Sequence, residues 1–381
     1  MPVFGTRPEA IKMMPLVKAL QGVKDVECTV CVTAQHREML DQVLHRFGIA
    51  PNYDLNIMED AQTLESLTAR VVTGVTAVLK EASPDLVLVH GDTTTTFASA
   101  LAAFYRKIPV GHVEAGLRSH DRYSPFPEET NRRLTAAIAE LHFAPTAANR
   151  ENLRKENIEK HVYVTGNTVI DALQQMVEEG YRFEDAALAA LYNGKRRGRR
   201  LILLTAHRRE NLGAPLENIC RAVRRIVLNN EDVEVVFPVH LNRDVRKVVW
   251  NVLDGVERVH LIEPVDVRDM HNLMNICYMV MTDSGGLQEE APALGKPVIV
   301  LRRETERPEI CAAGKAVLAG TEEEAIYAHA DRLLRDPAAY RTMQKALNPY
   351  GDGHAAARIV AAIRYWAGLS DHKPAEFTVH G

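Results

Sequence analysis

Two short apolar runs determine the architecture of this chain: Leu86-Val87-Leu88-Val89-His90-Gly91-Asp92 and Ile108-Pro109-Val110-Gly111-His112-Val113-Glu114. Each run has the composition of a buried strand and ends in a carboxylate. Ligands of an open parallel sheet bind outside the carboxyl ends of its strands, so we expect Asp92 and Glu114 to face one crevice. A third acid, Glu128, follows in an irregular segment. Crowded, unpaired carboxylates shift each other's pKa, and these acids therefore indicate proton handling.

Strands alternate with helical patterns along the rest of the chain. In the first half we expect strands up to residue 4 and at 26–32, 108–113, 141–144 and 161–164, with helices at 37–47, 94–106 and 127–139. After a charged segment at 193–200, strands are expected at 201–205, 233–238, 259–262, 278–282 and 297–301. This βα repetition predicts an α/β fold with two parallel sheets, each covered by helices on both faces.

Composition limits the function classes. The 381 residues, 46% of them hydrophobic, are enough for two cores, because single cores stop growing near roughly 250–300 residues. A net charge of -4 gives no general attraction to nucleic acid or to a membrane surface. No apolar run approaches the roughly 20 residues that span a bilayer. Five irregularly spaced cysteines and no secretory leader predict a reduced, cytoplasmic protein.

An anion site is expected where the first strand meets the first helix, at Gly5-Thr6-Arg7-Pro8-Glu9-Ala10-Ile11-Lys12. Arg7 and Lys12 lie near a helix start, where free amides favour anions. A turn arginine and a surface lysine would give the same sequence. The motif is neither G-x-G-x-x-G nor a Walker loop, which argues against tightly bound NAD and against ATP hydrolysis. Histidines such as His36 and His90 show no paired metal spacing, so we expect no metal site.

The strongest local signal is Thr282-Asp283-Ser284-Gly285-Gly286-Leu287-Gln288-Glu289-Glu290-Ala291-Pro292. A strand runs into a Ser-Gly-Gly turn and then a helix, whose bare amides suit a diphosphate. Glu290 could accept two ribose hydroxyls, and the plain alternative is an exposed helix acid. Arg307 could pair with phosphate or lie in a solvated loop. His207, after another strand, could donate to a leaving phosphate or be a satisfied loop histidine.

These motifs occur in order over nearly the whole chain. With His90-Gly91-Asp92-Thr93-Thr94-Thr95-Thr96, Gly111-His112-Val113-Glu114-Ala115-Gly116-Leu117-Arg118 and His207-Arg208-Arg209-Glu210-Asn211, they closely resemble the bacterial non-hydrolysing UDP-N-acetylglucosamine 2-epimerases. The resemblance implies a GT-B-like pair of Rossmann-like domains with the active site in the interdomain cleft. The first would span 1–168 and be completed by a helix at about 353–370, and the second, UDP-binding domain would span 169–352. A homodimer without a cofactor is also implied.

The resemblance assigns roles to individual residues. Asp92, Glu114 and Glu128 match the family's catalytic carboxylates, and His207 matches its cleft histidine. The residues that would bind the UDP-sugar are Arg7, Lys12, Val265, Met270, Ser284, Gly285, Gly286, Glu290 and Arg307. Candidates for binding a second, activating substrate molecule are Gln35, Arg208 and His240. Where many members have an aromatic pair near uracil, this chain has Val267 and Met270, so backbone contacts could survive there without side-chain stacking.

Chemistry narrows the expected reaction. No carbonyl acidifies the hydrogen on carbon 2 of this sugar, and no redox motif is present to create one. The remaining route expels UDP from carbon 1 while a base removes that hydrogen, giving 2-acetamidoglucal. Carbon 2 is then protonated from the other face and UDP adds back, which forms UDP-N-acetylmannosamine; the resemblance implies that this product serves cell-surface polysaccharide. Asp92 or Glu128 would be base and acid, and Glu114 would orient the sugar or offset positive charge. A hydrolysing epimerase, a GT-B glycosyltransferase and a non-catalytic nucleotide-sugar sensor remain alternatives.

Overall fold

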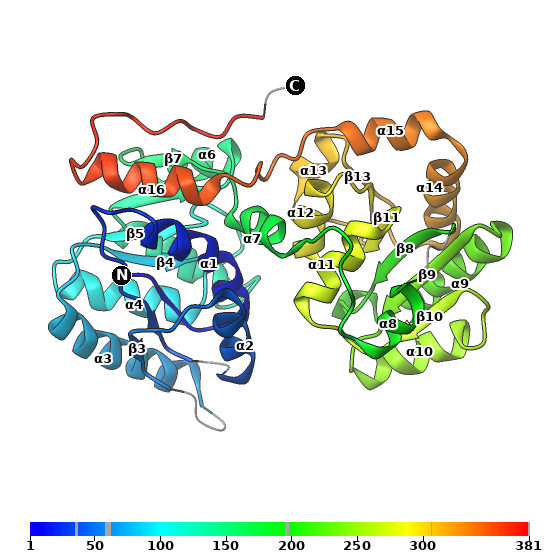
Figure 1. Cartoon of the computed structure of the whole chain (residues 1–381), viewed down its shortest axis with the longest axis horizontal. Helices are drawn as coiled ribbons and strands as arrows, with labels where there is room; N and C mark the ends of the chain where they lie inside the picture. Colours follow the sequence, from blue (N-terminus) through cyan, green and yellow to red (C-terminus); the bar gives the residue numbers. More distant parts are fainter. Residues whose placement is uncertain (35–36, 58–61, 195–197, 306, 380–381) are drawn as a thin grey trace. The chain divides into compact units, whose positions relative to one another are not determined.

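The computed structural model describes residues 1–34, 37–57, 62–194, 198–305 and 307–379 (Figure 1). The chain forms two compact units. Unit 1 comprises Met1–Ala172 and Tyr350–Thr378, and unit 2 comprises Leu173–Pro349 together with Val379. Each unit has parallel strands flanked by helices, so the expected pair of Rossmann-like halves is confirmed.

Unit 1 contains seven of the described strands, all paired in parallel. They are β1 (Val3–Phe4), β2 (Cys31–Val32), β3 (Tyr53–Asp54), β4 (Val87–His90), β5 (Val110–Val113), β6 (Leu141–Ala144) and β7 (Val162–Val164). The helices are α1 (Arg7–Gln21), α2 (Arg37–Phe47), α3 (Leu64–Ala82), α4 (Thr94–Tyr105), α5 (Glu128–Ile138), α6 (Ala147–Lys155), α7 (Thr168–Met176), which runs past the end of the unit, and α16 (Ala355–Trp366). A single parallel bridge between Pro2 and Leu88 joins β3-β2-β1 to β4-β5-β6-β7.

The strand expected at 26–32 is wrong in its extent. Only Cys31–Val32 pairs as a strand, because its neighbour β1 is two residues long and offers no further backbone partners. Val30 is instead held from the other side: its amide donates to Oδ1 of Asn52 at 2.8 Å, and its carbonyl accepts from the amide of Asn52 at 2.8 Å. Only residues 30–32 of this run are buried and Glu27 is exposed, so the predicted strand was too long at its start.

Unit 2 forms one six-stranded parallel sheet in the order β10-β9-β8-β11-β12-β13. Its strands are β8 (Arg200–Thr205), β9 (Val233–Pro238), β10 (Val259–Ile262), β11 (Met279–Thr282), β12 (Val298–Val300) and β13 (Ala316–Leu318). Its helices are α8 (Ala186–Tyr192), the 3₁₀ turn η1 (Arg209–Asn211), α9 (Ala214–Asn229), α10 (Arg243–Leu253), α11 (Val267–Ile276), α12 (Gly285–Ala293), α13 (Pro308–Ala312), α14 (Glu323–Arg335) and α15 (Pro337–Lys345).

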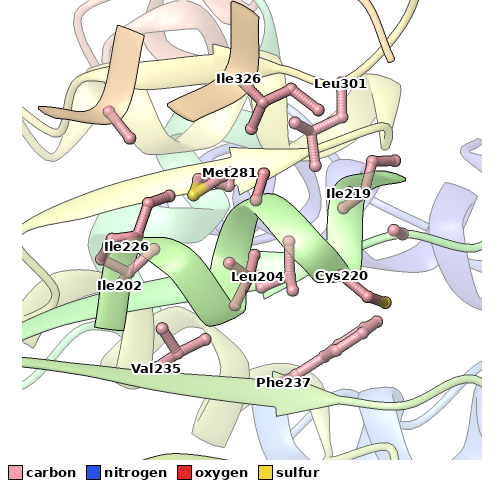
Figure 2. Close-up of a cluster of buried hydrophobic side chains, with 14 of the residues drawn as sticks. Ile202, Leu204, Ile219, Cys220, Ile226, Val235, Phe237, Met281, Leu301 and Ile326 are labelled. Carbon is pink, nitrogen blue, oxygen red and sulfur yellow. The ribbon is translucent and has the colours of Figure 1, made fainter. Parts of the chain in front are cut away.

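The core of unit 2 lies between α9 and the sheet, as Figure 2 shows. The apolar face of α9 contributes Ile219, Cys220 and Ile226, which are fully buried with side chains from the central strands. Full burial of such a side chain is worth about 1.5–3 kcal/mol. The rigid sheet that results fixes where the turns after β8 and β11 emerge.

Strand order locates a crevice in each unit. The chain order reverses between β1 and β4 in unit 1 and between β8 and β11 in unit 2. Ligands of doubly wound sheets bind at such a switch point, beyond the carboxyl ends of the strands. In unit 1 this point is flanked by the start of α1 and by Asp92, and in unit 2 by His207 and Asp283. The fold alone therefore selects two candidate sites.

Glu9 closes the switch point of unit 1. This buried carboxylate accepts hydrogen bonds from the amides of Gly5 at 3.0 Å and Thr6 at 2.8 Å, which start α1, and from the hydroxyl of Thr93 at 2.6 Å, which caps α4. Burial raises the pKa of Glu9, and the hydrogen bonds from Thr93 and Gly5 oppose that rise. The turns after β1 and β4 are therefore fastened to each other through one side chain.

The last helix, α16, belongs to unit 1 although it comes from the end of the chain. The carboxylate of Asp171 accepts the amides of Ala355 at 3.1 Å and Ala356 at 2.9 Å, which would otherwise lack partners at the helix start. α16 then packs on α1. It thereby supports the helix that carries Arg7 and Lys12.

Gly5 offers a test of this packing. A Cβ at Gly5 would lie 2.1 Å from Oγ1 of Thr33 and 2.8 Å from Oγ1 of Thr95. We expect Gly5→Ala to lower the unfolding free energy by about 1–3 kcal/mol through overpacking, measured by urea denaturation of the full chain. Gly22→Ala is the matched control, since its Cβ would meet nothing closer than 3.5 Å. Equal midpoints for the two variants would contradict the close approach at Gly5.

Candidate active site

A cavity of about 340 Å³ lies at the switch point of unit 1, within the size range of small-molecule sites. It is lined by the first turns of α1 and by the ends of β4 and β5. The lining residues are Thr6, Pro8, Glu9, Lys12, His90, Gly91, Asp92, Thr93 and Glu114. The structure thus brings together three of the predicted site residues, Lys12, Asp92 and Glu114.

Glu114 is fixed in an ionised form. It follows β5 with a φ of 64°, a left-handed conformation that costs free energy in a residue other than glycine. Its Oε1 pairs with the ammonium of Lys12 and accepts a hydrogen bond from the side-chain Nδ2 of Asn167 at 2.9 Å. Burial on its own would raise the pKa of Glu114, but the charge of Lys12 and these hydrogen bonds outweigh it and hold that pKa well below its usual range.

Asp92 has the opposite character. Burial, helped by the negative charges of Glu114 and Glu128, raises the pKa of Asp92 above its usual value, although the paired guanidinium of Arg132 opposes the rise. The side-chain Nδ2 of Asn131 also donates to the backbone carbonyl of Asp92 at 2.9 Å. A carboxyl whose pKa is raised can carry a proton closer to neutral pH, which suits a general acid or base.

Glu128 opens α5, the helix that also carries Asn131 and Arg132. Its Oε2 is buried and has no hydrogen-bond partner among the described residues.

The expectation that the acids are unpaired is wrong for Asp92 and Glu114, because Arg132 and Lys12 form ion pairs with them. Both ion pairs join segments far apart in the sequence, which is why the local pattern did not reveal them.

Arg7 and Lys12 divide the cationic roles of α1. Lys12 is engaged by Glu114, whereas Arg7, half-buried at the first residue of the helix, makes no ion pair with any residue in the described part of the chain. Helix starts attract anions through their free amides. Arg7 can therefore still bind an anionic group at the helix start.

In unit 2, Asp283 fastens the two turns at the switch point. Its buried Oδ2 accepts the amides of His207 and Arg208, both at 2.8 Å, and Nδ2 of Asn211 at 3.0 Å. The turn after β8 is thus tied to the turn after β11. The sequence analysis gave Asp283 no role of its own, although a residue directly after an apolar strand is expected at the ligand-binding edge of a parallel sheet.

The His207 ring stacks on His240, with centroids 5.2 Å apart. Partial burial lowers the pKa of His207, the charge of Asp283 opposes this, and His240 and Arg208 add to the decrease. A neutral imidazole offers one donor and one acceptor nitrogen. Of the predicted activator residues, Arg208 and His240 adjoin His207, whereas Gln35 lies outside the described residues.

The start of α12 carries the predicted diphosphate site. Ser284 is the residue before the helix, and its amide donates to Oγ1 of Thr282 at 2.9 Å. A Cβ on Gly285 would lie 3.0 Å from the guanidinium of Arg307, so the arginine lies against this turn. Nε of Arg307 donates to the buried Glu289 at 2.7 Å, which sets its orientation. A helix start and an arginine side by side form a site for phosphate oxygens.

The other predicted unit 2 residues also lie near carboxyl ends of strands. Glu290, on α12, has Oε2 at 3.3 Å from Nε2 of His271 on α11. Val265 lies between β10 and α11, and Met270 in the first turns of α11; both are partly buried. Val267 is the first residue of α11.

Sequence reasoning missed several partners of the predicted residues. Those partners are Arg132, Asn167, His271 and Glu289. Arg132 follows Glu128 by four residues on one helix face, which was a usable signal. Within the described parts of the chain, no helix has the length and apolarity of a membrane span, and no cluster of three or more histidine, cysteine, aspartate or glutamate side chains has the arrangement of a metal site.

Two doubly wound halves, one with paired acids in its cavity and the other with an arginine against a helix start, define a double Rossmann-like α/β protein. The chain belongs to the UDP-N-acetylglucosamine 2-epimerase family, whose model matches residues 18–364.

Individual relatives agree with this assignment. The UDP-N-acetylglucosamine 2-epimerase of Bacillus subtilis is 55% identical over 379 residues, covering 99% of this chain and 98% of the relative. An S. aureus protein solved with UDP is 48% identical with a TM-score of 0.87, covering 99% of both chains. The Neisseria meningitidis UDP-GlcNAc 2-epimerase bound to UDP-GlcNAc is 48% identical with a TM-score of 0.83, covering 95% of this chain and 98% of that one.

The Arg132–Asp92 pair can be tested without substrate. Replacing Arg132 by Gln removes the cation that opposes burial, so we expect the pKa of Asp92 to rise further. The measurement is a pH titration of the ¹³C-labelled Asp carboxyl resonances. Arg133→Gln is the matched control, because Arg133 lies on the same helix as Arg132 but pairs with Glu129 and with Glu156, the residue that follows α6. An unchanged Asp92 titration in Arg132→Gln would show that the pair has no electrostatic effect.

Proposed function

We propose that this chain catalyses the reversible epimerisation of UDP-N-acetylglucosamine to UDP-N-acetylmannosamine at carbon 2, without net hydrolysis. UDP would leave carbon 1 as the hydrogen on carbon 2 is removed, and would return to the 2-acetamidoglucal intermediate. The observation that carries the proposal is the contrast in one cavity between Glu114, which stays charged, and Asp92, whose pKa is raised. Groups with pKa values pushed apart are typical of acid–base catalysis.

Unit 1 supplies the sugar chemistry in this proposal. Loss of UDP leaves positive charge developing at carbon 1, and Glu114, fixed by Lys12 and Asn167, offers a preorganised negative charge to offset it. Asp92 exchanges the proton of carbon 2, and Glu128 serves the opposite face of the sugar. Both faces must be served, because inversion requires the proton to return from the side opposite to its removal.

Unit 2 holds the nucleotide in this proposal. The diphosphate meets the hydroxyl of Ser284, the amides of Gly285 and Gly286 and the guanidinium of Arg307, while Glu290 accepts the ribose hydroxyls. His207, favoured in its neutral form, donates to the departing diphosphate. The relatives solved with UDP and with UDP-GlcNAc support a nucleotide ligand of this kind. Val265 and Met270 are assigned to the uracil, and Arg7 to the sugar-linked phosphate.

The proposal has two further requirements and leaves two features as predictions. One bound molecule must be reached by groups of both units, so that the leaving diphosphate and the reacting carbon are handled together. No cofactor is needed, since the electrons of the broken bond leave with UDP and return with it. A homodimer in the cytoplasm and an activating role for Arg208 and His240 are kept as predictions.

Incubation with UDP-N-acetylglucosamine in heavy water tests the reaction. We expect deuterium at carbon 2 of both UDP-sugars, detected by mass spectrometry and NMR, because the proton on Asp92 exchanges with solvent. Asp92→Asn should lower exchange by about a hundredfold or more while UDP affinity stays nearly unchanged. Asp85→Asn is the control, since Asp85 is exposed at the opposite end of the same strand.

The other possible outcomes of these experiments would each contradict a part of the proposal. UDP release without a labelled epimer would replace the proposal by a hydrolysing epimerase or a glycosyltransferase. Unchanged sugar with tight binding would indicate a nucleotide-sugar sensor. Loss of UDP affinity in Asp92→Asn would contradict the role given to Asp92.

A further inference from the structure

His271 is a buried histidine for which the reaction gives no direct task. It lies on α11 with 2% of its surface exposed, and its Nε2 is 3.3 Å from Oε2 of Glu290. At this separation an N–H on Nε2 can donate to the carboxylate. His271 therefore contacts the acid assigned to the ribose while remaining shielded from solvent.

The state of the imidazole follows from its surroundings. Nδ1 of His271 is buried and has no hydrogen-bond partner among the described residues. A neutral imidazole carries one proton, and its tautomer is set by the contact that each nitrogen makes. Because Nε2 faces the carboxylate of Glu290 and Nδ1 faces no hydrogen-bond partner among the described residues, the tautomer that carries its proton on Nε2 fits this site.

Glu290 is confined from a second direction. Its Oε1 lies 3.6 Å from the position that a Cβ on Gly286 would occupy, so the carboxylate folds back over the first turn of α12, and the missing side chain of Gly286 leaves space beside it. Its side chain is 16% exposed, against 3% for His271. A ligand at the helix start can thus reach the carboxylate, whereas the imidazole behind it stays covered.

We infer that His271 is a positioning residue that orients Glu290 to bind the ribose hydroxyls of a uridine diphosphate, and so sets the preference for ribose over 2′-deoxyribose. This inference rests on the proposed function, which places the nucleotide at α12. A preorganised carboxylate can accept both hydroxyls of a ribose diol. Without the N–H of His271 the carboxylate loses one of the contacts that orient it, and the free energy of ordering it is taken from binding.

The experiment compares UDP with 2′-deoxy-UDP by titration calorimetry on the full chain. His271→Leu keeps the volume and removes the donor, whereas His271→Gln keeps an N–H near the position of Nε2. Met274→Ala is the control on the same helix. Met274 is fully buried, so its truncation removes packing without removing a side-chain hydrogen bond. Thermal unfolding of each variant is recorded alongside.

The wild type should bind UDP about tenfold more tightly than 2′-deoxy-UDP, since a lost hydrogen bond to a charged group is worth about 1.5–3 kcal/mol. His271→Leu should weaken UDP binding and leave 2′-deoxy-UDP nearly unchanged, so that the ratio falls to about twofold. His271→Gln should restore part of the ratio. Met274→Ala should lower stability and keep the wild-type ratio.

Two results would overturn the inference. If His271→Leu keeps the wild-type ratio, or weakens both ligands equally, His271 has only a packing role. If the wild type binds UDP but does not distinguish it from 2′-deoxy-UDP, Glu290 is not the ribose acid. Failure of the wild type to bind UDP at all would instead contradict the proposed function, and the two failures are therefore distinguishable.

Discussion

A buried carboxylate closes the switch point in each half of this protein, and both sites depend on it. Glu9 accepts the amides of Gly5 and Thr6, and Asp283 accepts those of His207 and Arg208. Each acid also takes a side-chain donor from across the reversal in strand order. Buried donors without partners cost about 1–3 kcal/mol each. The turns that present Lys12, Asp92 and His207 are therefore held in place by these two buried acids.

The two sites differ in how they treat charge. In unit 1 burial raises the pKa of Asp92 despite its pairing with Arg132, whereas the charge of Lys12 and the hydrogen bonds to Glu114 together outweigh burial and lower the pKa of Glu114. In unit 2 the helix start and Arg307 leave positive potential for an anion. Proton transfer and departure of a diphosphate need these two environments, and the chain builds each on its own parallel sheet.

Sequence patterns predicted the strands best where the bounds of a strand depend on its own residues and on the helices beside it in the sequence. Strands at 141–144, 233–238 and 259–262 were placed with the bounds that the structure has, because these apolar runs lie between clear helices. The run at 26–32 failed because its neighbour is too short. Asp92 and Glu114 were placed at one crevice because parallel strands end at the same edge. Their partners Lys12 and Arg132 come from distant segments. The spacing of Arg132 from Glu128 draws attention to this arginine but does not show that it pairs with Asp92.

The central claim is that the bond between carbon 1 and the diphosphate breaks and re-forms during turnover. Positional isotope exchange tests it most directly, using UDP-N-acetylglucosamine with ¹⁸O in the oxygen that bridges carbon 1 and the β-phosphorus. Free rotation of the released UDP should scramble the label into non-bridging positions, in substrate and epimer alike, as read by ³¹P NMR. Epimer that forms while all of its label stays in the bridge would contradict the account.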